Sequence, residues 1–107
     1  MNVLENVPYQ DQGMGKRKIA DEKYLLVMQI ALREGQEVPR HNANSNVNLL
    51  VLKGELSVDL SGEITSAKSG DFIPVEFKTP MVIKNIGTGD ATFLVIKTPN
   101  PSEMAKN

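Results

Sequence analysis

Apolar residues alternate with polar ones in short runs along most of the chain, and this period of two restricts the fold more than any other feature. In the stretch ELSVDL, Leu56, Val58 and Leu60 face one side of an extended chain, while the polar residues between them face the other. Such alternation is typical of a half-buried strand in an antiparallel sheet. Because the runs recur at short intervals between glycine turns, the pattern predicts a β-sandwich or a closed β-barrel.

Small and polar turn residues set the boundaries of the expected strands. We expect extended structure in the segments 23–35, 47–53, 55–60, 63–68, 71–77, 80–87 and 91–98. Lys53–Gly54 is a hinge between two strands, and Ser61–Gly62 closes a hairpin. The segment Gly87–Asp90 predicts a further hairpin between the last two strands. No stretch has the period of a helix.

The chain of 107 residues has the length of one domain with one core. Residues 1–22 contain only scattered apolar positions, so we expect an N-terminal arm that lies across the barrel or across a partner subunit. Residues 23–98 form the predicted barrel. Prolines interrupt residues 99–107, and we expect a flexible C-terminal tail there.

Charge and composition exclude several classes of function. Twelve basic and thirteen acidic residues leave a net charge of −1, which gives no electrostatic basis for binding nucleic acid or an anionic membrane. The sequence contains no cysteine, so thiolate metal sites and cysteine nucleophiles are excluded. No apolar run approaches the roughly 20 residues that span a bilayer, and the N-terminus does not have the pattern of a signal peptide. The expected location is the cytoplasm.

A framework of turn residues surrounds the single histidine. Gly35 is followed after five residues by His41, and Gly54 comes later in the same segment. A second group begins with a glycine and an aspartate: Gly70, Asp71, Pro74 and Asn85. In spacing, both groups resemble the two sequence motifs of the cupin family. The resemblance covers roughly residues 25–98 and implies an all-β fold, a double-stranded β-helix or jelly-roll barrel in a single domain.

The resemblance also implies a position for each of the family's usual metal ligands, which are three histidines and one glutamate. His41 occupies the first position. The second histidine of the first motif falls on Ala43 and the glutamate falls on Val47, and neither side chain has a donor atom.

The fourth ligand position depends on how the second motif is aligned. It falls on Thr79 if Pro74 anchors the alignment, and on Met81 if Asn85 does. A divalent first-row metal needs about three or four converging nitrogen or oxygen donors, and only His41 remains to supply one. We therefore predict no bound metal and no other cofactor.

In the segment that follows His41, asparagine alternates with small or apolar residues. If His41 points into the barrel, Ala43 and Ser45 do so too, and the asparagines lie on a loop and an outer face. Alternatively, a break in the alternation near Asn44 returns one or two amides to the rim of a pocket. Both alternatives are open at this point.

His41 itself has three open roles: a hydrogen bond to a backbone carbonyl, the orientation of a ligand, or metal ligation. Its imidazole is also a candidate general base. Metal-free cupin epimerases pair such a base with a tyrosine acid, for which this chain offers only Tyr9 and Tyr24. Neither tyrosine lies at a motif position.

A mainly apolar pocket is expected inside the barrel, with His41 and Thr79 at its rim. The residues expected to line it are Met28, Val47, Leu49, Phe72 and Met81. Such a pocket suits a small apolar or amphipathic ligand, so the main prediction is a non-catalytic, metal-free binding protein. The alternative is a small enzyme, either a metal-dependent oxygenase or isomerase with irregular ligands, or a metal-free isomerase that uses His41 as its base.

The segment NVNLLVLKG is apolar on both faces, with Leu49 and Val51 on one and Leu50 and Leu52 on the other. A strand that is buried on both faces needs cover beyond its own barrel. The apolar residues of the arm are too sparse to cover a whole sheet alone, although arms exchanged across a two-fold axis would seal an interface. The sequence therefore predicts a homodimer.

Overall fold

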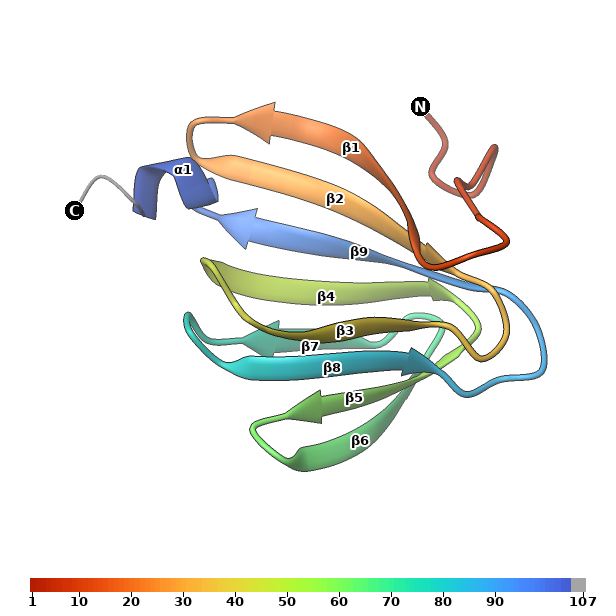
Figure 1. The fold of residues 1–107 in the computed structure, drawn as a ribbon. Coiled ribbons are helices and arrows are strands. Elements are labelled where there is room, and N and C mark those ends of the chain that lie inside the picture. Colours follow the sequence, from red (N-terminus) through yellow and green to blue (C-terminus); the bar gives the residue numbers. More distant parts are fainter. Residues whose placement is uncertain (105–107) are drawn as a thin grey trace.

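The computed structural model describes residues 1–104 and shows a β-sandwich of nine strands in two facing sheets (Figure 1). All of the paired strands are antiparallel. The larger sheet has five strands, in the order β1 (Gly15–Glu22), β2 (Leu25–Leu32), β9 (Ala91–Thr98), β4 (Asn46–Lys53) and β7 (Phe72–Val75). The smaller sheet has four strands, in the order β3 (Glu37–Asn42), β8 (Pro80–Asn85), β5 (Glu55–Leu60) and β6 (Glu63–Lys68).

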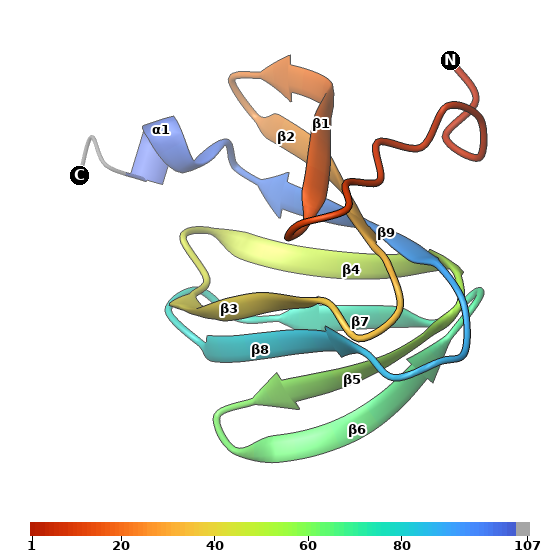
Figure 2. The same cartoon turned by 45° about the vertical axis from the view of Figure 1, so that its right-hand side comes forward.

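The chain passes from one sheet to the other after most strands, as the two views in Figures 1 and 2 show. Within residues 1–104, only β1–β2 and β5–β6 are consecutive strands that share a sheet. This connectivity belongs to a jelly roll, so the predicted all-β barrel is confirmed. It also brings strands that are distant in the sequence next to one another, such as β2 and β9.

The predicted hairpin between the last two strands is wrong. β8 pairs with β3 and β5 in the smaller sheet, whereas β9 pairs with β2 and β4 in the larger one. Gly87–Asp90 therefore carries the chain between sheets. A glycine-rich turn indicates that the chain reverses, but the partner of each strand is set by apolar packing across the whole sandwich, which no local segment encodes.

The core lies between the inward faces of the two sheets, where the alternation brings apolar side chains together. The most deeply buried of them come from both sheets: Leu32, Leu49, Val51 and Phe93 from the larger, and Leu56, Val58 and Ile83 from the smaller. Each such side chain contributes about 1.5–3 kcal/mol on burial. Since a shift of one residue would expose the whole set, this core fixes the register of the strands.

Two of the predicted turns have backbone angles that explain their residues. Gly54, the hinge between β4 and β5, has a φ of 88°, and a Cβ atom there would lie 2.6 Å from the Cβ of Ala91. Ser61 and Gly62 have positive φ angles of 55° and 90°, which suit the tight turn of the β5–β6 hairpin. Only glycine satisfies both the angle and the close contact at position 54.

Residues 15–22, which the sequence analysis assigns to the N-terminal arm, form the edge strand β1. Charged side chains occupy much of this strand, so no apolar alternation marks it. In the remaining arm, residues 3–6 contact the outer face of the larger sheet. Gln29 and Arg17 both donate hydrogen bonds to carbonyls of the arm, and the bond from Gln29 Nε2 to the Val3 oxygen measures 2.7 Å.

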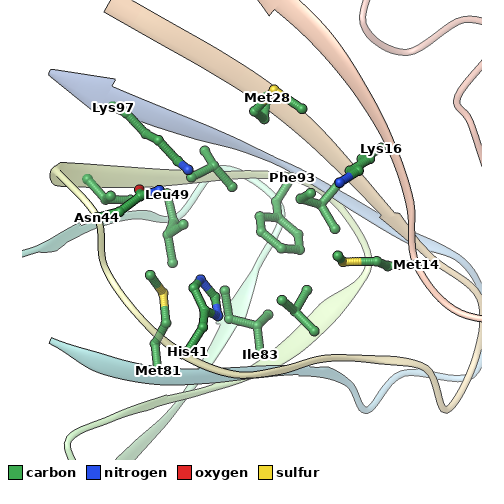
Figure 3. Close-up of a pocket in the computed structure, with 14 residues that line it drawn as sticks. Met14, Lys16, Met28, His41, Asn44, Leu49, Met81, Ile83, Phe93 and Lys97 are labelled. Atoms are coloured by element: carbon green, nitrogen blue, oxygen red, sulfur yellow. The ribbon is translucent and has the colours of Figure 1, made fainter. Parts of the chain in front are cut away.

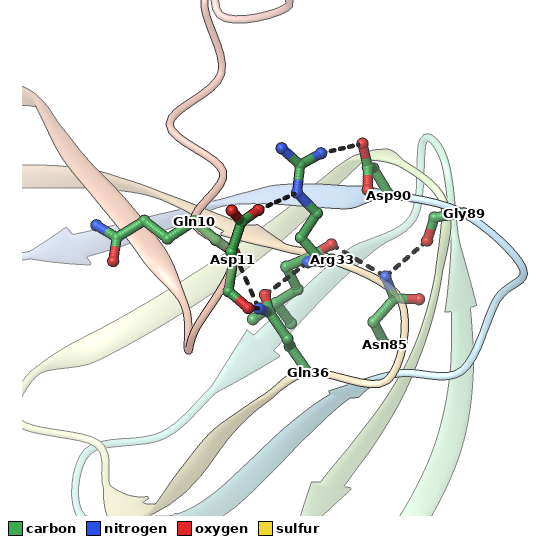
Figure 4. Close-up of polar contacts among 8 residues, drawn as sticks. Gln10, Asp11, Arg33, Gln36, Asn85, Gly89 and Asp90 are labelled. Atoms are coloured by element: carbon green, nitrogen blue, oxygen red, sulfur yellow. Dashed lines mark hydrogen bonds and ion pairs between the residues drawn. The ribbon is translucent and has the colours of Figure 1, made fainter.

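A second set of polar contacts joins the arm to one end of the barrel (Figure 4). The Arg33 guanidinium lies 2.9 Å from Asp90 Oδ2 and 4.0 Å from Asp11 Oδ1. Nearby, the buried Asn85 side chain donates hydrogen bonds to two backbone carbonyls. One belongs to the last residue of β2, at 3.0 Å, and the other to Gly89, within the crossover from β8 to β9, at 2.8 Å. The asparagine of the second motif therefore holds the crossover in place.

Hydrogen bonds tie the start of the C-terminal segment to the end of β1, and the flexible tail expected over residues 99–107 stays a prediction. The short helix α1 (Pro101–Met104) follows Asn100, which is 9% exposed and donates from Nδ2 to Asp21 Oδ1 at 2.7 Å. One buried amide thus anchors the segment, which composition does not reveal. The last part of the expected tail, residues 105–107, lies outside the described residues. Within residues 1–104, no helix has the length and apolar character needed to cross a membrane.

Candidate functional site

A cavity of about 190 Å³ lies between the two sheets (Figure 3). Most of its wall is apolar and consists of Met14, Met28, Ile30, Val38, Val47, Leu49, Met81, Ile83, Phe93 and Val95. Four polar residues complete it: Lys16, His41, Asn44 and Lys97. An apolar wall with a few polar groups is the usual composition of a small-molecule site.

Strand pairing explains how residues far apart in the sequence meet at this cavity. In the larger sheet, Lys16 pairs with Ile30, which pairs with Phe93, so the three form one row across β1, β2 and β9. Lys97 lies opposite Val47 on the neighbouring strand β4. Because Phe93 and Lys97 are four residues apart on an extended strand, both side chains point to the inner face.

On the smaller sheet, His41 of β3 pairs directly with Met81 of β8. This pairing favours the alignment that places the fourth ligand position on Met81, since Met81 lines the cavity beside His41 (Figure 3). Thr79, predicted at the rim, lies in the turn before β8 and does not line the cavity. Its carbonyl accepts a hydrogen bond from the N–H of Ala43 at 2.9 Å.

Most of the predicted lining residues lie together at the cavity, namely His41, Met28, Val47, Leu49 and Met81. Phe72 does not join them, because its side chain is 58% exposed. It pairs with Leu50 across β7 and β4, so it points away from the barrel, and its neighbour Ile73 points inward instead. In a strand of only four residues, the alternation is too short to show from the sequence which residues point inward. That the lining residues bind a ligand remains a prediction.

The segment between β3 and β4 combines the two alternatives that the sequence left open, because it leaves the strand while burial still alternates along it, with Ala43 buried and Asn44 exposed. Residues 43–45 belong to no strand, and Asn44 reaches the lining of the cavity. Asn42 and Asn46 are exposed, as the other alternative requires. Ser45 is buried, and its hydroxyl donates to the Pro99 carbonyl at 2.6 Å. One amide of the row is thus available to a ligand in the cavity.

The ring of His41 points into the cavity (Figure 3), and its Nδ1 lies 3.0 Å from the Pro39 carbonyl oxygen. This contact is the first of the three roles considered for the histidine. Neither tyrosine lines the cavity: Tyr24 is 72% exposed, and the Tyr9 ring packs against Arg33, 4.9 Å from its Cζ. The structure therefore does not bring together a histidine base and a tyrosine acid.

The two lysines of the cavity are not among the residues predicted from the sequence, although the signal for one of them is present. Lys97 follows Phe93 and Val95 at alternate positions of β9, so the phase that places Phe93 inside also places Lys97 inside. Burial in the cavity wall, followed by the nearby Lys16 ammonium, lowers the pKa of Lys97 below that of an ordinary lysine. Within residues 1–104, no ion pair includes either lysine.

The cavity does not offer a donor set that fits a metal ion. Of the ligand positions that the family resemblance implies, His41 provides one nitrogen, and Met81 adds a thioether that suits soft ions such as Cu(I). Ala43 and Val47 provide no donor. In the described part of the chain, no cluster of three or more histidine, cysteine, aspartate or glutamate side chains is placed to hold a metal.

The same fold occurs in several proteins of known structure. An RmlC-like cupin family protein, MJ0764 of Methanocaldococcus jannaschii, matches with a TM-score of 0.81 and 28% identity over 88% of this chain and 87% of the other. A double-stranded β-helix protein from Klebsiella pneumoniae matches with a TM-score of 0.85 and 20% identity, over 94% of this chain and 89% of the other. The Cnp3 cupin domain of Schizosaccharomyces pombe has a TM-score of 0.81 and 19% identity, over 96% and 76%. The last two matches show the fold alone.

Sequence comparison agrees with the comparison of structures. No protein-family model matches the chain. The uncharacterised protein MJ0764 of Methanocaldococcus jannaschii, however, is 32% identical over 88 residues, which are 81% of this chain and 76% of the archaeal protein. On this identity, this coverage and the shared double-stranded β-helix, the chain belongs to the RmlC-like cupin family.

Proposed function

We propose that this cupin binds a small amphipathic molecule in the cavity between its sheets, without a metal and without catalysis. The observation that supports the proposal is the lining, in which ten apolar side chains surround the volume and four polar ones interrupt it. An apolar cavity of about 150 Å³ is large enough for benzene. The present cavity of about 190 Å³ therefore suits one ring or a chain of about six to eight carbon atoms.

The absence of a metal is part of the proposal, because one imidazole and one thioether are too few donors for a divalent first-row ion. Metal analysis of protein purified without chelator and without a nickel column should find no stoichiometric ion. Stoichiometric manganese, iron, nickel or zinc that disappears in His41→Ala would contradict this part of the proposal and favour the enzyme alternative.

The methionines provide a direct test of binding. Three of the five line the cavity (Met14, Met28 and Met81), while Met1 and Met104 lie outside it. We expect uncharged probes of suitable size, phenylacetamide and hexanamide, to shift the methyl NMR signals of the three cavity methionines. The signals of Met1 and Met104 are the internal control and should not move. Shifts at all five methionines, or at none, would contradict binding in the cavity.

A further inference from the structure

Two lysines are directed toward the cavity from opposite sides (Figure 3), of which Lys97 is half-buried and Lys16 is exposed. Lys97 lies on β9, the central strand of the larger sheet, and faces the same side as Val95 and Phe93. Lys16 lies on the edge strand β1, in the row of Ile30 and Phe93. Two ammonium groups that face an apolar wall require a physical reason.

Protection of a sheet edge explains at most one of them. An inward lysine on an edge strand discourages pairing with the edge of another molecule, and Lys16 on β1 meets that description. Lys97 does not, because β9 is hydrogen-bonded to β2 on one side and to β4 on the other. Edge protection therefore does not account for the charge of Lys97, which faces the cavity.

Among residues 1–104, no acidic side chain lines the cavity or forms an ion pair with either lysine. In the described part of the chain, the titratable residues of the lining are Lys16, Lys97 and His41, and no aspartate or glutamate is among them. Burial and the neighbouring ammonium make the charged form of Lys97 less favourable, as the direction of its pKa shift indicates. An anion in the cavity would remove this penalty, because an opposite charge within hydrogen-bonding distance favours the ammonium form.

We propose that the ligand is a small organic acid whose carboxylate is bound by the Lys97 ammonium and the Asn44 amide. Lys16 adds a second positive charge from the opposite side, and the apolar body of the acid packs against the methionines and Phe93. Figure 3 shows both lysine side chains and Asn44 directed toward the cavity. This inference rests on the proposed function, since it names the chemical class of the ligand at that same site.

The experiment compares acids with amides of the same shape. Phenylacetate and phenylacetamide differ only in the head group, and hexanoate and hexanamide repeat the comparison for a chain. Dissociation constants are obtained from the methyl signals of the three cavity methionines at pH 7.5 and low salt. We expect each acid to bind about tenfold more tightly than its amide, because hydrogen bonds to charged groups are stronger than neutral ones.

Variants assign the preference to a residue. Lys97→Met should make acid and amide bind equally, and Lys97→Gln repeats the test with a polar side chain. Lys16→Met should reduce the preference by about twofold to threefold, since Lys16 is an exposed residue whose screened charge strengthens binding only when Lys97 holds the carboxylate. Lys18→Met is the matched control, because it removes the same charge from β1 at an exposed lysine that pairs with Asp21 at 2.7 Å. It should leave the preference unchanged.

The outcomes separate this inference from the proposed function. Equal binding of acid and amide by the unaltered protein, or a preference that survives in Lys97→Met and Lys97→Gln, overturns the inference and leaves amphipathic binding in place. If neither acids nor amides shift the cavity methionines, both proposals are wrong. A preference that Lys18→Met abolishes as fully as Lys97→Met would show general electrostatic attraction, and it also overturns the inference.

Discussion

Each face of the larger sheet carries side chains that are unusual for it: the inner face has charged residues, and the outer face has apolar ones. The inner face lines the cavity and carries Lys16 and Lys97 among its apolar residues. The outer face points away from the barrel and carries half-buried or exposed apolar residues: Leu25, Val27, Leu50, Leu52, Leu94, Ile96 and Phe72. The N-terminal arm covers one end of this face through its hydrogen bonds with Arg17 and Gln29.

The register of the strands explains why the chain cannot place its inner lysines outside and its outer apolar residues inside. A shift of one residue would exchange the two faces, but it would also expose the core on the inner side. The register that buries Phe93 therefore also directs Lys97 inward and Leu94 outward. We propose that each face has a partner: an anion for the inner lysines, and an apolar surface for the outer leucines.

The largest effect is expected from a charge placed on the inner face outside the cavity. Val51 is 1% exposed, so Val51→Asp would bury an unpaired carboxylate and cost about 4 kcal/mol or more of the free energy of unfolding. Circular dichroism should show no cooperative thermal transition. Leu50→Asp, one residue away on the half-buried outer face, is the control and should keep the fold. Similar melting of the two variants would remove the distinction between the faces.

The next effect concerns the outer face, where we propose that a second copy of the chain packs. Ile96 is near the middle of this face, paired with Val27 on β2 and with Asn48 on β4. A two-fold contact there would bury well above about 1,000 Å² in total.

Light scattering at micromolar concentration should give the mass of two chains, and Ile96→Lys should reduce it to one. Lys97→Met, the next position but on the inner face, should leave the mass unchanged. An unaltered protein that stays monomeric on concentration would contradict the proposal.

Much of the fold can be predicted from the sequence, because its signals are local. Alternation identifies the long strands. Gly54 and Ser61–Gly62 identify two turns, because these residues tolerate the positive φ angles that the turns require. The edge strand β1 is not predicted, since Lys16, Arg17 and Lys18 put charge on both of its faces. The partners of β8 and β9 are not predicted either, because pairing between sheets depends on contacts between segments distant in the sequence.

In the candidate site, most of the apolar wall and His41 can be predicted from the sequence, but the two lysines and the orientation of Asn44 cannot. Met28, Val47 and Leu49 follow from the phase of long strands. Lys97 has the same phase, but it is not predicted, because the inner face is identified from its apolar residues and a lysine is not one of them. Asn44 reaches the cavity only because residues 43–45 leave the strand, and a turn-prone segment does not specify where its amides point.

A smaller effect is expected at Lys97, where a substitution should stabilise the protein and not destabilise it. Lys97→Met removes a charge that burial disfavours, so it should raise the melting temperature by roughly 4–8 °C while it abolishes the preference for acids. The folded protein holds the Lys97 proton more weakly than the unfolded chain does, whose lysines titrate near 10.5. The unaltered protein should therefore gain stability as the pH rises from the lowered pKa toward 10.5, and the variant should lack this gain.

Melting curves of both proteins between pH 7 and 10.5 test this prediction, and their difference cancels the titration of groups common to both. Lys18→Met, at an exposed position in an ion pair with Asp21, is the control and should not stabilise the protein. A Lys97→Met variant that melts at a lower temperature than the unaltered protein would mean that the ammonium stabilises the fold, and the inner face would need no ligand to account for its charge.

The smallest effect is expected at His41, on the opposite wall of the same cavity. The residue is exposed, and its contact with the Pro39 carbonyl is a single hydrogen bond worth about 1 kcal/mol at most. His41→Ala should therefore lower the melting temperature by less than roughly 4 °C and should keep the preference for acid over amide. If this variant unfolds as readily as Val51→Asp, the histidine belongs to the core. If it loses the acid preference while Lys97→Met retains it, His41 recognises the head group, and the charge difference between the two faces of the larger sheet has no part in binding.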